Sequence, residues 1–145
     1  MKRNGKAVWN GSGPEGSGSL TTPSGALSAY PYSAKLRFQN EDGKAGTNPE
    51  ELIAAAHAGC FSMALAFRLT ANGTPAARIE AEASLDLIKG DSGWGIPTIS
   101  LTVHATVAGL DDAKFQELAA DAKANCPVSK LLAGAAISLT ATLAS

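Results

Sequence analysis

The feature that most constrains this fold is the segment from Asn48 to Leu69, which is predicted to form one long helix. Asn48 suits the N-cap, and Pro49 suits the first helical position. Glu50 and Glu51 then put negative charge where the helix dipole favours it. The helix should therefore begin sharply at Pro49.

From Leu52 to Phe67 this helix is apolar on every face apart from His57, Cys60 and Ser62. A helix that is apolar all round is expected to be buried, with no solvent face of its own. Because Arg68 interrupts the apolar run, we interpret the segment as too short to span a membrane. It is predicted to be the central helix of the fold.

The composition indicates one ordinary globular domain over residues 1–145. Lys and Arg number 12 against 13 Asp and Glu, so no net field points to nucleic acid or to an acidic membrane surface. The basic N-terminus has no apolar segment behind it, which predicts that there is no signal peptide. We therefore expect a cytoplasmic protein without a membrane anchor, in which a permanent structural disulfide would be unusual.

In most of the rest of the chain, apolar and polar residues alternate as expected for strands, and two shorter helices are predicted between these strands. Because neighbouring strands are joined by short turns, we expect an α+β fold with mainly antiparallel sheets and helices on one face. A polar loop over residues 40–47 should lead into the central helix. The predicted strands are 5–10, 19–22, 34–38, 78–88, 97–107 and 136–143. One predicted helix is capped by Asp111 or Asp112 and ends at Ala124, and the other covers residues 127–132.

The only two cysteines, Cys60 and Cys126, have different settings. A lone thiol in an apolar helix is most simply a small buried hydrophobic group, and this explains Cys60. Cys126 precedes Pro127 and a short helix, where the helix dipole and free amides stabilise a thiolate. The spacing is no C-x-x-C motif and does not show that the sulfurs meet. If they pair, redox chemistry is the better reason.

The chain has two histidines, His57 and His104. His57 precedes Cys60 by one helical turn, so it either orients or activates the thiol or is a core histidine bonded to another group. His104 lies on the polar face of a predicted strand and should be solvated. A zinc site of His57, Cys60 and Cys126 lacks paired-ligand spacing, so no metal is expected.

Arg37 and Glu50 have simple explanations as a solvated strand residue and a complement to the helix dipole. Glu50 lies ten residues before Cys60, which is ~15 Å along one helix, so the two cannot touch within a chain. Two copies of the helix packed antiparallel about a twofold axis would bring them together. An apolar helix that needs covering on two sides also favours a homodimer.

These residues resemble the OsmC family, which includes the organic hydroperoxide resistance proteins. The resemblance extends over essentially the whole chain, as a single OsmC-like domain. It implies an intertwined homodimer with two active sites at the subunit interface. The segments that carry it are 48–65 and 126–129, with Trp9, Pro31, Tyr32, Arg37, Phe38, Gly46, Thr47 and the strand around residues 137–139.

The resemblance also implies a thiol-dependent peroxidase, an antioxidant enzyme of the stress response. In it, Cys60 is the reactive thiol and Cys126 the resolving one, while Arg37 holds the thiolate and Glu50 holds Arg37. The implied substrates are organic hydroperoxides in preference to hydrogen peroxide. The implied reductant is an external dithiol, such as one of lipoyl type, and no cofactor is needed.

Thiol chemistry gives this assignment a definite requirement. Burial raises the pKa of Cys60, so a cation has to offset it, and Arg37 is the best candidate. Attack on peroxide would leave a sulfenic acid on Cys60. Cys126 would condense with this sulfenic acid to form a disulfide, and an external dithiol would reduce the disulfide. The alternatives are a redox sensor, or a module that binds a small apolar ligand and carries inert thiols.

Overall fold

The computed structural model describes residues 1–40 and 43–144 of the chain. Within it the chain forms two compact units, Met1–Leu52 and Ile53–Ser145, which are described in turn. The expected loop over residues 40–47 includes residues 41–42, which lie outside the described residues.

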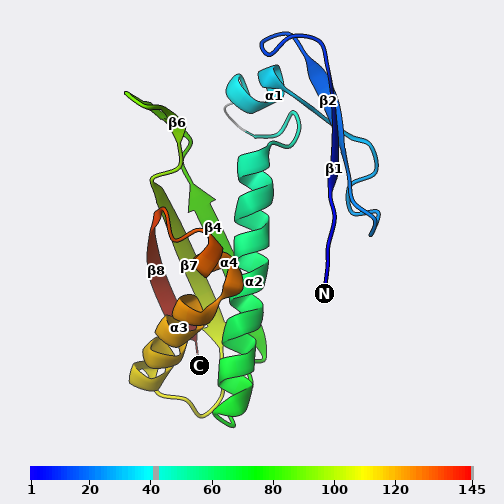
Figure 1. Cartoon of the computed structure of the whole chain (residues 1–145). Helices are drawn as coiled ribbons and strands as arrows, with labels where there is room; N and C mark the ends of the chain where they lie inside the picture. Colours follow the sequence, from blue (N-terminus) through cyan, green and yellow to red (C-terminus); the bar gives the residue numbers. More distant parts are fainter. Residues whose placement is uncertain (41–42, 145) are drawn as a thin grey trace. The chain divides into compact units, whose positions relative to one another are not determined.

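The first unit contains a three-stranded antiparallel sheet in the order β1-β2-β3, of which Figure 1 shows β1 and β2 side by side. Its strands are β1 (Lys6–Asn10), β2 (Ser17–Thr21) and β3 (Tyr30–Ser33). The tight turn after β1 has Gly11 at φ 87°, a conformation that favours glycine. The first two predicted strands are therefore confirmed within about two residues at their ends.

The third predicted strand, over residues 34–38, is wrong. These residues form the short helix α1 (Ala34–Phe38), and the third strand lies just before it. The Ser33 hydroxyl accepts a hydrogen bond from the Leu36 N–H at 3.1 Å, so Ser33 is the N-cap of α1. Five alternating residues are too few to separate a strand from a helical turn, and the cap decided the outcome.

The predicted central helix is observed as α2 (Pro49–Ala71). The Asn48 side chain accepts a hydrogen bond from the Glu51 N–H at 2.8 Å, and Gly73 follows the helix at φ 82°. With 23 residues and a mean hydropathy of 1.5, α2 is long and apolar enough to cross a membrane, so the prediction that it is too short is wrong. The core helix of a soluble protein meets the same criteria, and α2 has a core to pack into.

That core belongs to the second unit, whose sheet has the order β4-β7-β8. The strands are β4 (Arg78–Leu85), β7 (Thr98–Thr106) and β8 (Ala136–Ala144). A separate hairpin of β5 (Ile88–Gly90) and β6 (Gly93–Gly95) follows β4, so the predicted strand over residues 78–88 ends early. The predicted alternation of half-buried and exposed residues along β4 is confirmed.

The expectation of mainly antiparallel sheets holds for β4 and β7 but not for β7 and β8, which are parallel. The chain passes between them through α3 (Asp112–Asn125) and α4 (Pro127–Leu131). A crossover that contains helices brings the next strand back in the same direction, whereas a tight turn reverses it. The two predicted helices themselves are confirmed, with Asp111 as the N-cap of α3.

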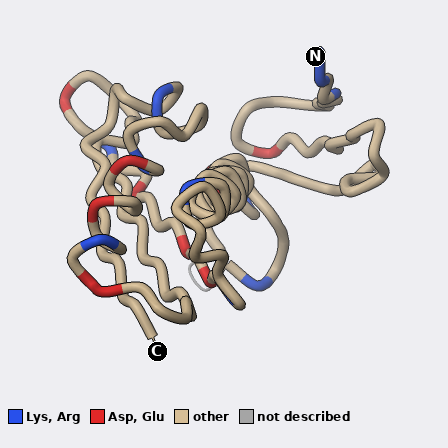
Figure 2. Tube along the Cα trace, turned by 90° about the horizontal axis from the view of Figure 1, so that it is seen from below, with Lys and Arg blue, Asp and Glu red and all other residues tan. Residues whose placement is uncertain are grey.

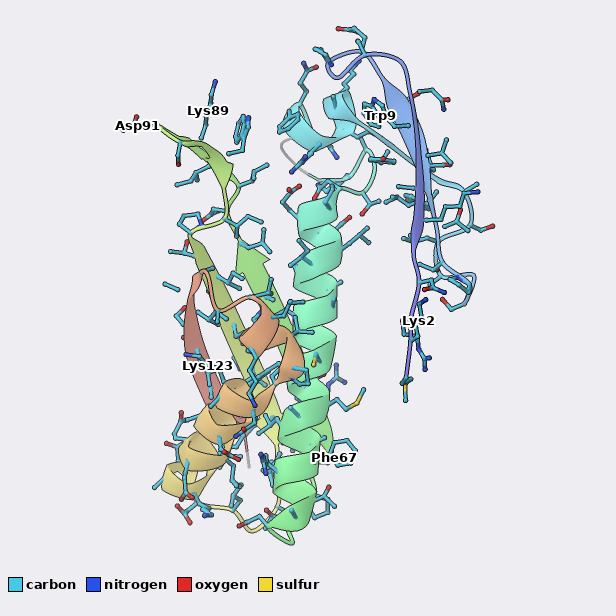
Figure 3. The ribbon with its side chains drawn as sticks, in the orientation of Figure 1. Lys2, Trp9, Phe67, Lys89, Asp91 and Lys123 are labelled. Carbon is cyan, nitrogen blue, oxygen red and sulfur yellow. The ribbon has the colours of Figure 1, made fainter. Side chains whose placement is uncertain are left out.

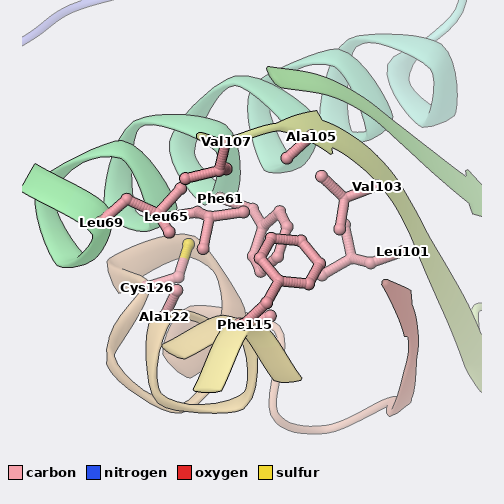
Figure 4. Close-up of a cluster of buried hydrophobic side chains, with 11 residues drawn as sticks. Phe61, Leu65, Leu69, Leu101, Val103, Ala105, Val107, Phe115, Ala122 and Cys126 are labelled. Carbon is pink, nitrogen blue, oxygen red and sulfur yellow. The ribbon is translucent and has the colours of Figure 1, made fainter. Parts of the chain in front are cut away.

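The core lies between the helices and one face of this sheet (Figure 4). Residues at intervals of four on α2 (His57, Phe61, Leu65 and Leu69) are buried together with alternate residues of β7 and the inner side of α3. The largest fully buried side chains include Phe61, Phe115, Leu65, Leu69 and Leu101. The second unit therefore depends on one stripe of α2.

The opposite side of α2 is not buried by the sheet and helices of the second unit. Met63 is 62% exposed and Phe67 is 70% exposed, and Phe67 projects away from the sheet of its unit (Figure 3). The second unit therefore covers one side of α2, and the expected cover of the other side by a partner subunit stays a prediction. One sheet with its helices can cover only one side of α2, and the apolar composition of the other side requires a separate explanation.

We predict that Leu101→Ala destabilises the protein by about 2–5 kcal/mol, because the truncation leaves a cavity in a packed core. Leu101 is 1% exposed on β7, while Leu131, at the end of α4, is 80% exposed and serves as the matched control. Leu131→Ala should change the free energy of unfolding by no more than about 0.5 kcal/mol. Urea unfolding would measure both values, and equal losses would contradict the assigned core.

Candidate active site

The two cysteines, 66 positions apart in sequence, come together in the structure. The Cys126 and Cys60 sulfurs lie 3.2 Å apart, and both are free thiols. Cys60 is half-buried on α2, whereas Cys126 is fully buried, with its sulfur directed towards α2 (Figure 4). The structure therefore supplies the contact that the sequence spacing left open.

Local structure explains how Cys126 is held. It ends α3, where its N–H donates to the Ala122 carbonyl at 2.8 Å, and it is also the N-cap of α4. Pro127 fills the first position of α4, as a proline does at a helix start. The junction between two helices thus fixes the Cys126 backbone against α2.

The surroundings move the pKa values of the two thiols in opposite directions. Burial raises the pKa of Cys60; the Val128 amide opposes this, and the neighbouring Cys126 adds to it. Burial also acts to raise the pKa of Cys126, but hydrogen bonding from the Ser129 amide, the Cys60 thiol, the Ser129 hydroxyl and the Val128 amide outweighs it, so that the pKa is lowered. In this unit, Cys126 therefore ionises before Cys60.

The raised pKa of Cys60 agrees with the expectation from the sequence that burial disfavours its thiolate. The groups that shift the pKa of Cys60 in the second unit are an amide, a thiol and the apolar surroundings, and none of them is a cation. A reactive thiolate on Cys60 therefore needs a positive charge from elsewhere. A reactive role for Cys60 remains a prediction that depends on that charge.

His57, one helical turn before Cys60 on α2, is bonded to a residue that was not among the predicted site residues. Its Nε2 lies 2.8 Å from the Ser129 hydroxyl, and both side chains are buried. Burial lowers the pKa of His57, so the ring is neutral near pH 7. Ser129 stands three residues after Cys126, in the N3 position of α4, and that spacing was the available signal.

His104 is exposed on β7, as predicted. Among the described residues, no group of three or more His, Cys, Asp and Glu side chains is placed to hold a metal ion.

Arg37 and Glu50 form an ion pair within the first unit. Arg37 Nε donates to Glu50 Oε2 at 3.1 Å, and its Nη2 donates to Oε1 at 2.5 Å. Two parallel bonds of this kind fix both position and orientation. Arg37 comes from α1 and Glu50 from the first turn of α2, so the mispredicted element carries one of the predicted site residues.

An aromatic pocket lies beside Arg37 in the same unit, with a volume of about 200 Å³. The Trp9 and Tyr32 rings are 5.3 Å apart, and Trp9 lies close to α1 (Figure 3). Gly18 stands between them in the sheet, where a Cβ would come within 2.7 Å of the Tyr32 ring. The lining residues are Trp9, Gly13, Tyr32, Ser33, Ala34, Arg37, Phe38 and Pro49.

The four predicted site residues therefore form two pairs, each within one unit. Cys60 meets Cys126, and Arg37 meets Glu50. That the two pairs act in one active site stays a prediction. The structure adds Ser129 and the aromatic pocket to the candidate residues.

A long helix that carries one thiol, packed against a sheet and against the helix junction that carries the second, defines an α+β dithiol protein. The chain belongs to the family described as OsmC-like protein, whose model matches residues 41–142. The resemblance inferred from the sequence is therefore confirmed.

Two relatives are similar along most of the chain. Peroxiredoxin OsmC of Escherichia coli (strain K12) is 43% identical over 132 residues, which cover 91% of this chain and 90% of that protein. The organic hydroperoxide resistance protein OhrB of Bacillus subtilis (strain 168) is 32% identical over 117 residues, covering 81% and 82% of the two chains.

Solved structures agree with the fold. The crystal structure of OhrB of Bacillus subtilis gives a TM-score of 0.67 at 29% identity, covering 97% of this chain and 98% of that one. The OsmC-like protein from Mycoplasma pneumoniae gives 0.77 at 15% identity, covering 100% and 99%. The α+β OsmC-like fold, with a long helix packed against a sheet, is thereby confirmed.

Proposed function

We propose that this chain is a thiol-dependent peroxidase that reduces organic hydroperoxides to alcohols. The observation that carries the proposal is the 3.2 Å contact between the Cys60 and Cys126 sulfurs. Two free thiols at this distance can close a disulfide after one of them is oxidised. The names of the relatives, a peroxiredoxin and organic hydroperoxide resistance proteins, support the same class of enzyme.

In the proposed reaction, the Cys60 thiolate attacks the distal peroxide oxygen. The O–O bond breaks, an alcohol leaves, and Cys60 becomes a sulfenic acid. Cys126 then attacks the Cys60 sulfur, so that the S–S bond forms and water leaves. Exchange with an external dithiol, such as one of lipoyl type, restores both thiols.

Cys60 is proposed as the first nucleophile, although its pKa is raised in its own unit. Cys60 is the half-buried thiol and Cys126 the fully buried one, so peroxide can approach Cys60 more easily. A positive charge near Cys60 would stabilise its thiolate. We assign this role to Arg37, which Glu50 holds through two hydrogen bonds.

The exposed apolar side of α2 supports the proposal of a homodimer. This side includes Ala56, Gly59, Met63 and Phe67, at the spacing of one helix face. At Gly59, an added Cβ would meet nothing within 4 Å, so a second helix could approach closely there. Antiparallel packing of two such helices would bring Glu50 of one copy towards Cys60 of the other. Each chain, as a single domain over residues 1–145, would then be intertwined with the second copy.

The aromatic pocket beside Arg37 supports organic hydroperoxides as the substrate class. A cavity of about 150 Å³ with apolar walls accommodates benzene, so the pocket of about 200 Å³ suits a small aryl or alkyl group. Each buried methylene contributes about 0.8 kcal/mol, which hydrogen peroxide cannot gain.

We place this activity in the cytoplasm, where external dithiols are kept reduced. Lys, Arg, Asp and Glu are interspersed along the trace of the second unit (Figure 2), and the formal net charge of the chain is −1. This gives no support to nucleic acid as a partner.

We predict that one equivalent of cumene hydroperoxide removes both free thiols of reduced protein, and faster than hydrogen peroxide does. Cys60→Ser should abolish turnover, whereas Cys126→Ser should allow one round and leave a sulfenic acid that dimedone traps. A thiol count with mass spectrometry measures these outcomes. Intact thiols in folded protein would indicate an inert binding module, and oxidation without catalytic recycling by a dithiol would indicate a sensor.

We predict that Arg37→Ala raises the pH midpoint for alkylation of Cys60 by about one unit or more, because an adjacent cation favours the thiolate. The measurement uses the Cys126→Ser background, in which Cys60 is the only cysteine. Arg78→Ala, which removes an exposed arginine paired with Glu80, is the control. An unchanged midpoint after Arg37→Ala would remove Arg37 from the proposed site.

We predict a dimer at micromolar concentration that Met63→Lys weakens by more than about 100-fold, since a lysine would be buried unpaired in an apolar interface. Ile88→Lys, at an exposed position on β5, is the matched control and should leave assembly unchanged. Sedimentation equilibrium measures both. A monomeric wild-type protein would contradict the proposed dimer.

A further inference from the structure

Among the described residues, two hydrogen bonds between side chains join α2 to the start of α4, and one of them involves no sulfur. Cys60 meets Cys126, and one helical turn earlier on α2 His57 meets Ser129, which lies three residues after Cys126. The proposed reaction uses the first contact. The second is a buried polar contact to which that reaction assigns no role.

The position of the proton on His57 follows from its surroundings. His57 is fully buried, and its Nδ1 has no hydrogen-bond partner among the described residues. A neutral imidazole carries its proton on one nitrogen only, and a buried N–H without an acceptor is rarer than a buried acceptor without a donor. The proton is therefore assigned to Nε2, which faces Ser129.

This tautomer determines what the Ser129 hydroxyl can do. Because Nε2–H donates to Ser129 Oγ at 2.8 Å, the hydroxyl proton is not used by His57. A hydroxyl accepts and donates at the same time, so it can pass this proton towards another acceptor. In the opposite tautomer, the Ser129 hydroxyl would donate its proton to the imidazole. The hydroxyl oxygen could then only accept a hydrogen bond from the Cys126 thiol.

We propose that His57 and Ser129 are positioning residues for Cys126: His57 Nε2–H holds the Ser129 hydroxyl so that it donates to the Cys126 sulfur and stabilises its thiolate. Neither residue touches the peroxide. Both act on the thiol that resolves the sulfenic acid.

Electrostatics support this assignment. The Ser129 hydroxyl and amide are among the groups that lower the pKa of Cys126. Burial lowers the pKa of His57, which keeps the ring neutral and preserves an uncharged donor to Ser129. Among the described residues, the titratable group that shifts the pKa of Cys126 is Cys60 on α2. The lysines nearest to Cys126 in sequence are Lys130 on α4, which is exposed and donates to Asn125, and Lys123 on α3.

The inference rests on the proposed function, because it assigns Cys126 the resolving step. In that step the Cys126 thiolate attacks the Cys60 sulfenic acid, the S–O bond breaks as the S–S bond forms, and the departing hydroxide takes up a proton as water. A larger thiolate fraction on Cys126 shortens the life of the sulfenic acid. That limits its further oxidation by a second peroxide.

The experiment titrates Cys126 directly, in the Cys60→Ser background where it is the only cysteine. Iodoacetamide alkylation rates are measured against pH for this background alone and with Ser129→Ala, His57→Leu or both. We expect each single substitution to raise the midpoint by about one unit, a tenfold loss of thiolate at a fixed lower pH. The double variant should show no further rise, since both residues act through one hydrogen bond.

Three variants make the result specific. His57→Gln keeps an N–H donor near the position of Nε2 and should restore most of the original midpoint. His104→Gln and Ser138→Ala change an exposed histidine and an exposed serine of the sheet and should have no effect. Circular dichroism checks folding, and Ser129→Ala carries the test if His57→Leu does not fold.

The outcomes divide clearly. A midpoint unchanged or lowered by Ser129→Ala overturns the proposal, because the hydroxyl then does not donate to the sulfur. A rise with Ser129→Ala that His57→Leu fails to reproduce in folded protein overturns the role of His57. The titration uses no peroxide, so it stands apart from the proposed function, which fails separately if the protein with both cysteines consumes no hydroperoxide.

Discussion

The packing of one stripe of α2 against the sheet and helices of its unit is the contact on which the rest depends. His57, Phe61, Leu65 and Leu69 recur every four residues and are all buried. Cys60 is next in sequence to Phe61 of this stripe, so the core packing that fixes Phe61 also fixes the position of Cys60 along and around the axis of α2. A thiol contact of 3.2 Å is possible because both sulfurs are attached to packed helices.

The same packing gives the two thiols different chemistry. Cys126 lies at a helix start, where backbone N–H groups and the Ser129 hydroxyl stabilise negative charge, whereas Cys60 lies inside a helix whose amides are already bonded. Within the second unit, Cys126, the proposed resolving thiol, therefore ionises more readily than Cys60, the proposed reactive thiol. An arginine held by a carboxylate, as Arg37 is by Glu50, is the kind of group that can reverse this order.

The composition of α2 is unusual because its exposed side is also apolar. A helix with one buried face normally has a polar opposite face, but here that side carries Met63 and Phe67. Length and hydropathy alone would also suit a membrane span. In the proposed homodimer, a second copy of the helix covers this side.

Much of this protein follows from local sequence. Asn48 and Pro49 start α2, Asp111 caps α3, and alternation along β4 and β7 marks their inner faces, because caps and periodicity depend on neighbours in the chain. The helical α1 is also local, because the Ser33 cap, which the alternating pattern of residues 34–38 concealed, determines it. Tertiary structure decided the rest. The parallel β7–β8 pair, the sulfur contact and the His57–Ser129 bond depend on residues far apart in sequence. No local pattern records such distances, because only the packing of a complete core determines which side chains meet across it.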